Sequence, residues 1–400
     1  MAKRGDSGRN SYHQDDEKPV FLGMNFRIKS IEGCRGLATI LIMFVHFAVM
    51  FYPAVYWGPE YTHWQNGLDY LLWQIVPFPS GHSGVMLFLL ITSFGTYIAV
   101  NGDKIDIRKY LLLRYFKLLL LTLLGVLPII ILLQSNMIFV TYILSNLNTP
   151  WFGNWSPGEI NFWQALLHNP LSSLAAYNGV LWTMPYFFWG MILSFIMAKC
   201  FSKNFQENLY FSLGVFLLLA NMAQYYYMVC VTGTFLAYCY KYHTAKFQVS
   251  ALKRVILFAL AWYLCSYPAG IVGKEGIFLH HSFQQAYILY HTAGATLLAA
   301  LALMQNSLLQ KAMKSRIFQW LGRYSMGIYL IHYPLLISLM AYLYRQLPEF
   351  LSYPVKTLLL LLVYIICVLA AGVPIQAAGN YLFRLMDKLY KYIFRRCCSE

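Results

Sequence analysis

Residues 35–54 read RGLATILIMFVHFAVMFYPA, a run whose single charged side chain, Arg35, stands at its start. A helix of about 20 residues, rising ~1.5 Å per residue, crosses the ~30 Å hydrocarbon core of a bilayer. The run therefore predicts a membrane-spanning helix that begins on the side of the membrane rich in basic residues. His46, in the middle of the run, would then lie deep in the membrane.

The composition of the whole chain points to the same environment. Of the 400 residues, 59% are hydrophobic and 11% are charged, whereas a soluble domain carries about 25% charged residues. Similar apolar runs follow near residues 82–100, 110–135, 180–199, 208–220, 225–241, 252–272, 285–304, 325–345 and 355–383. We therefore expect an all-α, polytopic membrane helix bundle of about ten transmembrane helices.

The basic residues predict the orientation of this bundle. With the N-terminus in the cytoplasm, the positive-inside rule is satisfied by all of the 30 Lys and Arg residues except Lys274, Arg345 and Lys356. Joining the runs 208–220 and 225–241 into one helix would invert the orientation of every later helix and break the positive-inside pattern. We therefore expect two helices there. Both termini are then cytoplasmic, and the net charge of +15 reflects topology and not a nucleic-acid partner.

One membrane domain with short ends is expected. Residues 1–34 are predicted to be a disordered or amphipathic cytoplasmic segment, residues 35–385 the ten-helix domain, and residues 386–400 a basic cytoplasmic tail. The cysteines and histidines do not show the spacing of a metal site, so no metal is expected.

Arg35 and His46 are eleven residues apart on the first predicted helix. Eleven steps of ~100° return to within ~20° of the starting direction, so the two side chains share one stripe with about 16 Å between them. A histidine in hydrocarbon needs a hydrogen-bond partner or a cavity. A neutral His46 that is hydrogen-bonded between helices and a catalytic His46 are both compatible with this pattern.

Arg114 and Lys117 share a face of the third predicted helix because they are three residues apart. A basic cluster at an inner membrane boundary is common, which is one interpretation of this pair. The other is an anion site, formed where these two side chains and Arg35 converge on phosphate groups.

Five segments, in order along the chain, carry a resemblance to a known family. They are Gly33–His46, Ser80–Phe88, Leu113–Lys117, Leu181–Met184 and Leu321–Pro334. Their order, spacing and motifs resemble those of the acyltransferase-3 family of integral membrane acyltransferases. In that family the first helix carries an Arg and a His at the same separation, and a late segment carries Tyr-Leu-x-His-x-Pro.

The resemblance implies an O-acyltransferase, and specifically an O-acetyltransferase. The donor would be acetyl-CoA or another acyl-CoA from the cytoplasm, and the acceptor a hydroxyl of a cell-surface carbohydrate or similar molecule. Carried over to this sequence, His46 is the catalytic base or a transient acyl carrier. Arg35, Arg114 and Lys117 bind the CoA phosphates or the thioester end.

The resemblance places Trp182 on the acceptor side, and His82 is a further candidate for binding the acceptor or for capping a helix. His332, within the late motif, is assigned a packing role. Because the family is mainly bacterial, we expect the bacterial inner membrane as the location. No further cofactor is implied.

The sequence also departs from the family pattern. Phe187 stands where the branch with Trp-Thr-Met usually has a Glu, and Lys117 replaces the second Arg of Arg-x-x-Arg. Two alternatives therefore stay open beside the enzyme. One is a transporter or exporter of a lipid-linked or small amphiphilic molecule, against which the absence of Asp and Glu from the predicted membrane core argues. The other is a catalytically silent relative that acts as a scaffold.

Overall fold

The computed structural model describes residues 28–53, 79–101, 107–140, 163, 171, 178–243, 249–267 and 286–397, and in these ranges all regular elements are helical. The long helices are α1 (Lys29–Phe51), α4 (Gly81–Val100), α5 (Ile107–Gln134), α9 (Met184–Cys200), α10 (Phe205–Asn221), α11 (Tyr225–Tyr242), α12 (Ala251–Cys265), α13 (Ala286–Leu303), α15 (Arg316–Leu335) and α17 (Tyr353–Cys397). The short elements are the 3-10 helix η2 (Gly179–Thr183), α14 (Leu308–Met313), the π-helix η4 (Leu336–Met340) and α16 (Ala341–Gln346).

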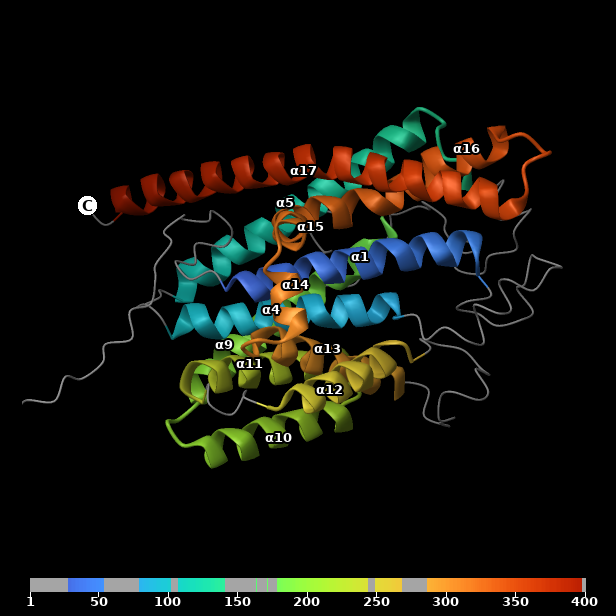
Figure 1. Cartoon of the computed structure of the whole chain (residues 1–400). Helices are drawn as coiled ribbons and strands as arrows, with labels where there is room; N and C mark the ends of the chain where they lie inside the picture. The colour runs from blue at the N-terminus through green and yellow to red at the C-terminus, as the bar shows by residue number, and fades with distance from the viewer. Residues whose placement is uncertain are drawn as a thin grey trace, which may run out of the picture.

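Seven helical segments in the described ranges are long and apolar enough to cross a membrane. They are Lys29–Phe51, Gly81–Val100, Tyr110–Gln134, Gly179–Cys200, Ala286–Leu303, Arg316–Gln346 and Tyr353–Tyr392. The predicted polytopic membrane helix bundle is thereby confirmed. The three other predicted spans, α10, α11 and α12, are helices of 17, 18 and 15 residues and are not among these seven. They lie alongside the longer helices in Figure 1.

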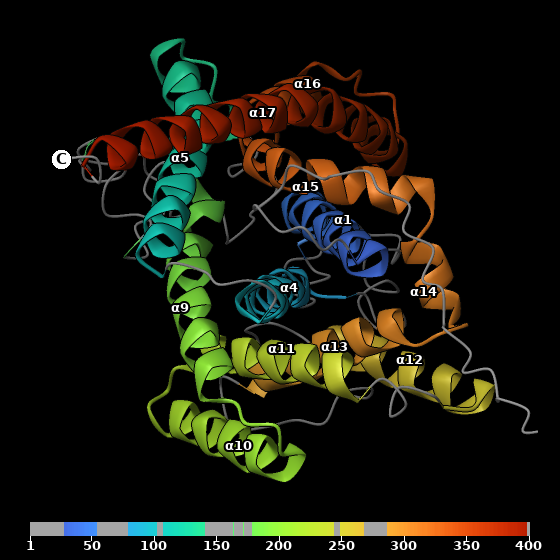
Figure 2. The same cartoon turned by 90° about the vertical axis from the view of Figure 1, so that its left-hand side faces the viewer.

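The helices α1 and α4 form the inside of the bundle. Seen along the helix axes in Figure 2, they are surrounded by α5, α9, α11, α13, α15 and α17, with α10 at the edge. In the most apolar stretch of α4, 78% of the residues are buried, against 22% in α17. An apolar helix with so little burial is suited to face lipid. The residues of interest on α1 and α4 are thus surrounded by protein.

Glycines let α15 approach its neighbours closely. A Cβ added at Gly322 would lie 2.1 Å from the backbone oxygen of Glu32 on α1. A Cβ added at Gly327 would lie 2.1 Å from the backbone oxygen of Gly372 on α17. Small residues at such crossings are the usual means by which membrane helices pack, since lipid offers little hydrophobic drive for helix association. The α15 helix is therefore held tightly between α1 and α17.

The predicted separation of the fifth and sixth spans is confirmed. The α10 helix ends at Asn221, and α11 begins at Tyr225. Between them Ala223 adopts a φ of 55°, a left-handed conformation that a continuous α-helix does not contain. The chain therefore makes a turn at this point and does not continue as one bent helix.

The first and last spans run antiparallel. The hydroxyl of Tyr353, at the start of α17, donates to the carbonyl of Phe51, at the end of α1, and Tyr52 Oη lies 2.5 Å from Thr357 Oγ1. As Figure 1 shows, α1 begins and α17 ends at the same end of the bundle. Two termini on one side of the membrane require this arrangement. Which side that is stays a prediction.

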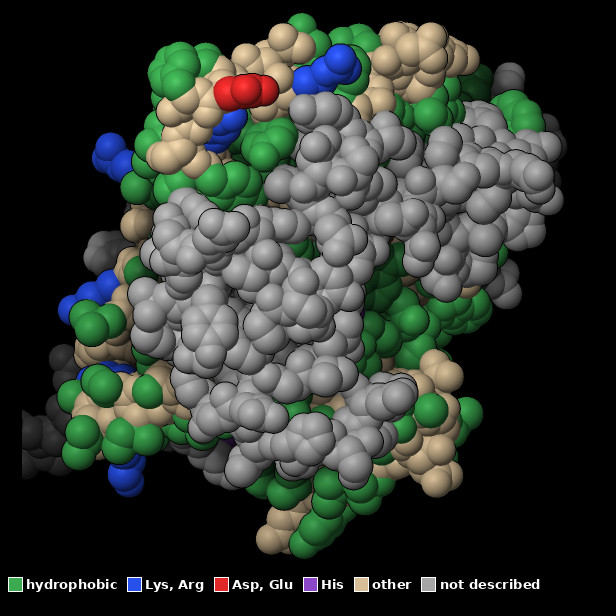
Figure 3. All heavy atoms as spheres, turned by 90° about the vertical axis from the view of Figure 1, so that its right-hand side faces the viewer, with side chains coloured by type: hydrophobic (Ala, Val, Ile, Leu, Met, Phe, Trp, Pro, Cys, Tyr) green, Lys and Arg blue, Asp and Glu red, His purple; other side chains and the backbone are tan. Residues whose placement is uncertain are grey.

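The boundaries of these two helices extend beyond the predicted membrane domain. The α1 helix begins at Lys29, and α17 continues to Cys397, through most of the predicted tail. The opposite end of the bundle is seen in Figure 3, where the described side chains around its edge are mostly hydrophobic and few are charged. This is the end at which α1 ends and α4 begins.

Candidate active site

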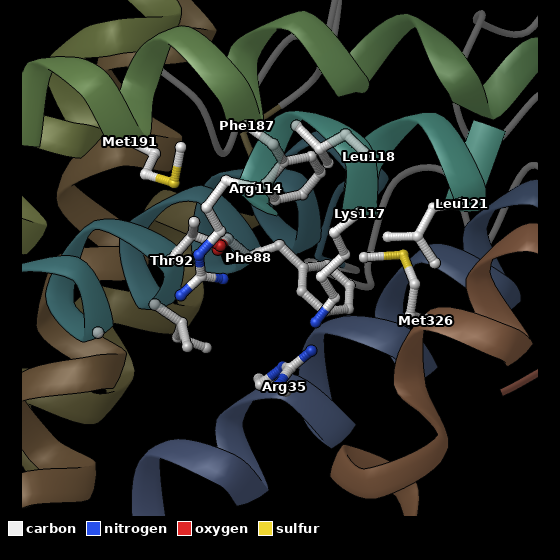
Figure 4. Close-up of a pocket in the computed structure, with 12 residues that line it drawn as sticks. Arg35, Phe88, Thr92, Arg114, Lys117, Leu118, Leu121, Phe187, Met191 and Met326 are labelled. Atoms are coloured by element: carbon white, nitrogen blue, oxygen red, sulfur yellow. The ribbon is translucent and has the colours of Figure 1, made fainter. Parts of the chain in front are cut away.

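Three basic side chains line one pocket between α1, α4, α5 and α9. Arg35 comes from α1, and Arg114 and Lys117 come from adjacent turns of α5. Each of the three residues is 9% exposed, a degree of burial that is rare for charged residues. Figure 4 shows the ends of Arg35 and Lys117 pointing toward one another, with Arg114 turned to the same space. The structure thus brings together the three predicted donor-binding residues.

The charges of this pocket are close enough to interact. Arg35 Nη1 lies 3.7 Å from Glu32 Oε2, one turn earlier on α1. Lys117 experiences repulsion from Arg114 and Arg35 and attraction from Glu32, and its ammonium lies 5.0 Å from the ring centroid of Phe383 on α17. Gathering like charges away from water is unfavourable. An anionic group bound between the three side chains would offset their mutual repulsion.

Apolar side chains form most of the remaining wall. The lining is completed by Phe88, Ile91, Thr92, Gly95, Leu118, Leu121, Phe187, Met191 and Met326. Phe187 packs edge-on against Phe88, with ring centroids 6.5 Å apart and an interplanar angle of 76°. The pocket is therefore cationic on one side and apolar on the other. Such a lining fits a molecule that joins an anionic part to an uncharged one.

His46 lies further along α1 and is hydrogen-bonded to His332 of α15. The distance from His46 Nδ1 to His332 Nε2 is 2.6 Å, and the two rings are inclined by 12°. His332 is 1% exposed. The hydrogen-bonded arrangement considered for His46 is thus present. It does not exclude chemistry at His46, because an imidazole has a second nitrogen.

Two aromatic residues link the pocket wall to this histidine pair. The ring centroid of Phe88 lies 5.9 Å from that of Tyr329, which in turn lies 5.7 Å from that of His332. The hydroxyl of Tyr329 donates to the carbonyl of Val180 at 2.7 Å. This bond fixes the Tyr329 ring between Phe88 and His332. The cationic pocket and the histidine pair therefore belong to one packed cluster.

His82 and Trp182, the two residues predicted on the acceptor side, lie together at the start of α4. Their ring centroids are 5.6 Å apart, and His82 also contacts the rings of Tyr287 and His291 at 5.2 and 6.4 Å. Ser80 Oγ accepts the backbone N–H of His82 at 3.3 Å, so it is Ser80 that caps the helix.

This group contains unsatisfied nitrogen atoms. Among the described residues, the buried Nδ1 atoms of His82 and His291 have no hydrogen-bond partner. His291 uses its other nitrogen to bond the carbonyl of Tyr267 at 2.8 Å. Two buried ring nitrogens beside Trp182 are chemically suited to a hydroxyl-bearing ligand. His291 Nδ1 can accept a hydrogen bond, because Nε2 of the same ring donates to a carbonyl, and His82 Nδ1 can donate or accept depending on its tautomer.

His332 is the residue that sequence reasoning undervalued. It was assigned a packing role, yet it is the hydrogen-bond partner of His46. A usable signal was present, because two lone histidines in membrane spans both need partners and can supply them to each other. Tyr329, one turn before His332, was missed in the same way, since one Tyr among 32 carries no signal of its own.

Phe187 lies in the wall of the cationic pocket. The resemblance implies a Glu at this position in the branch with Trp-Thr-Met, and such a carboxylate could pair with His46. In this structure His332 takes that place, so the absence of the Glu does not leave His46 without a partner. Within the described ranges, no group of three or more His, Cys, Asp or Glu side chains is placed to hold a metal ion.

Comparison with known proteins gives no match to a curated protein or to a solved structure. A family model described as an acyltransferase domain matches residues 28–376, which include all five segments of the resemblance and both histidines of the pair. The chain therefore belongs to the acyltransferase-3 family and is an integral, multi-pass membrane acyltransferase that uses an acyl donor and an acceptor.

Proposed function

We propose that the protein transfers an O-acyl group, specifically O-acetyl, from cytoplasmic acyl-CoA to a hydroxyl of a cell-surface carbohydrate or a similar acceptor. The observation that carries this proposal is the convergence of Arg35, Arg114 and Lys117 in one pocket. Acyl-CoA joins several phosphates to an uncharged acyl-thioester arm. Guanidinium and ammonium groups bind phosphate oxygens through charge-assisted hydrogen bonds, and the apolar wall suits the arm.

His46 is the proposed catalytic group. It lies on the same helix as Arg35, deeper in the bundle, and the packed series from Phe88 to His332 extends from the pocket to its ring. A neutral imidazole can take the proton of an acceptor hydroxyl, or accept the acyl group itself. In either case His46 acts where donor and acceptor meet.

The acceptor side is assigned to His82 and Trp182. Trp182 supplies a flat apolar surface for a sugar ring, and His82 supplies a hydrogen-bonding nitrogen beside it. These residues lie at the end of the bundle opposite to Arg35, since α4 begins where α1 ends. A donor from one side of the membrane and an acceptor from the other would then meet between them.

The same orientation places both termini in the cytoplasm. In a bacterial inner membrane the donor pocket would open toward cytoplasmic acyl-CoA, and the acceptor group toward the cell surface. The concentration of Lys and Arg at the donor end supports this orientation.

The direct test is turnover of labelled acetyl-CoA by the purified protein in nanodiscs, with and without a carbohydrate acceptor. We expect release of CoA or labelling of the wild-type protein, and loss of both in His46→Ala. Unchanged thermal stabilisation of His46→Ala by CoA would show that this variant still folds and binds the donor. Absence of both turnover and CoA-induced stabilisation in the wild type would instead favour a transporter or a silent relative.

A further inference from the structure

The contact between His46 and His332 is a hydrogen bond between two imidazoles. At 2.6 Å, His46 Nδ1 and His332 Nε2 must share one proton, with one nitrogen donating and the other accepting. Neutral imidazole carries a single N–H, so the protonation of one ring determines the protonation of the other.

The bond engages Nδ1 of His46, so chemistry at this ring falls to Nε2. Nε2 of a neutral imidazole carries a lone pair only when the proton is on Nδ1. In that tautomer His46 donates from Nδ1, and Nε2 of His332 accepts. A His332 that accepts at Nε2 therefore supports the form of His46 that can act as a base or nucleophile.

We infer that His332 is a positioning residue that holds His46 in the tautomer protonated at Nδ1, with the lone pair on Nε2. The inference rests on the proposed function of His46, since it names the atom at which His46 acts. Either role for His46 needs a nitrogen lone pair, whether to take a proton or to attack a thioester. His332 does not touch the substrate and acts through His46.

The local structure of α15 holds His332 in place. Pro334 lacks the N–H that would bond the carbonyl of Leu330, and Asn178 Nδ2 donates to this carbonyl at 3.0 Å instead. The hydroxyl of Ser338, in the π-helix η4, donates to the carbonyl of Pro334 at 2.7 Å. The Tyr364 hydroxyl reaches the carbonyl of His332 itself at 3.4 Å. Short π-helical turns of this kind are frequent at functional sites.

The proposed transfer moves one proton through His46 Nε2. The acceptor hydroxyl gives its proton to His46 Nε2 while its oxygen bonds the carbonyl carbon of the thioester. The C–S bond breaks, and the CoA thiolate leaves with the bonding electron pair. His46, now an imidazolium, keeps its Nδ1–H bond to His332 Nε2, which stabilises the new charge. The proton on His46 Nε2 passes to the thiolate, giving the ester, free CoA and neutral His46.

The test compares His332→Gln with His332→Leu. In His332→Gln, the side-chain amide can place an oxygen near the former Nε2 position and accept from His46 Nδ1, whereas the side chain in His332→Leu cannot accept a hydrogen bond. We expect His332→Leu to lower kcat for acetyl transfer roughly a hundredfold, and His332→Gln by about tenfold or less. The KM for acetyl-CoA and the thermal shift on adding CoA stay unchanged in both.

A matched control is His243→Gln. His243 is hydrogen-bonded to the Tyr238 hydroxyl at 3.2 Å and has no part in the site, so the kcat of this variant should equal that of the wild type. Equal loss of kcat in His332→Gln and His332→Leu, or wild-type kcat in His332→Leu, would overturn the inference. A wild-type protein without turnover would instead count against the proposed function, so the two failures are distinguishable.

Discussion

Phe187 packs edge-on against Phe88 in the wall of the pocket that Arg35, Arg114 and Lys117 line. This contact explains what the departure from the family pattern does here. The side chain at position 187 lines the cationic pocket, so its charge and polarity affect the binding of a ligand there. The absence of a carboxylate at this position leaves the pocket more positive and one wall apolar.

Replacing Phe187 by Glu should therefore weaken donor binding. The carboxylate would offset part of the positive charge that attracts phosphate, and we expect the KM for acetyl-CoA to rise about tenfold, roughly 1.4 kcal/mol. Steady-state kinetics with varied acetyl-CoA measures this. Phe187→Leu, which keeps the wall apolar, is the control. A rise in kcat at unchanged KM in Phe187→Glu would show that the position serves proton transfer and not donor binding.

Lys117→Met should separate stability from function. Removing one of three neighbouring cations relieves repulsion with Arg35 and Arg114, so the free protein should be at least as stable as the wild type. CoA-induced thermal stabilisation should fall because a phosphate contact is lost. Lys117→Arg, which keeps the charge, should retain most of it. Thermal unfolding in detergent with and without CoA gives both quantities, and a less stable Lys117→Met with intact CoA response would contradict the anion site.

Trp182→Ala should affect the acceptor and spare the donor. Its ring packs against His82, away from the three cations, so we expect acceptor-dependent transfer to fall at least about tenfold. Acceptor-independent release of CoA should stay at the wild-type rate. Both rates come from one assay run with and without acceptor. Parallel loss of the two rates would mean that Trp182 supports the fold or the donor site instead.

Gly322→Val should destabilise the bundle. A Cβ at this position would lie 2.1 Å from the Glu32 carbonyl oxygen, so α15 and α1 would have to separate. We expect a loss of at least about 3 kcal/mol, seen as a large drop in thermal stability or as failure to purify. Gly214→Ala on α10 is the matched control, since nothing lies within 4 Å of its added Cβ. This control should be neutral or stabilised by up to about 1 kcal/mol.

Much of the fold could be predicted from local patterns in the sequence. Apolar runs predict membrane helices because the bilayer sets the length of a span and forbids unsatisfied backbone groups. The run around His46 and the break at Asn221–Gln224 were both predicted correctly in this way. The motifs between Gly33 and Pro334 indicated the family that the match over residues 28–376 then confirmed. Charge counting gave an orientation that remains a prediction.

The sequence alone determined the helical bundle, the family and the candidates Arg35, His46, Arg114 and Lys117, because these depend on local patterns and on short motifs in a fixed order along the chain. Only the tertiary structure decided which distant residues meet. His46 and His332 are 286 positions apart, and the placement of Phe187 in the cationic pocket depends on how α9 packs against α4 and α5. In a membrane, helix contacts depend on the close fit of small groups such as Gly322 and carry little periodic signal along the sequence.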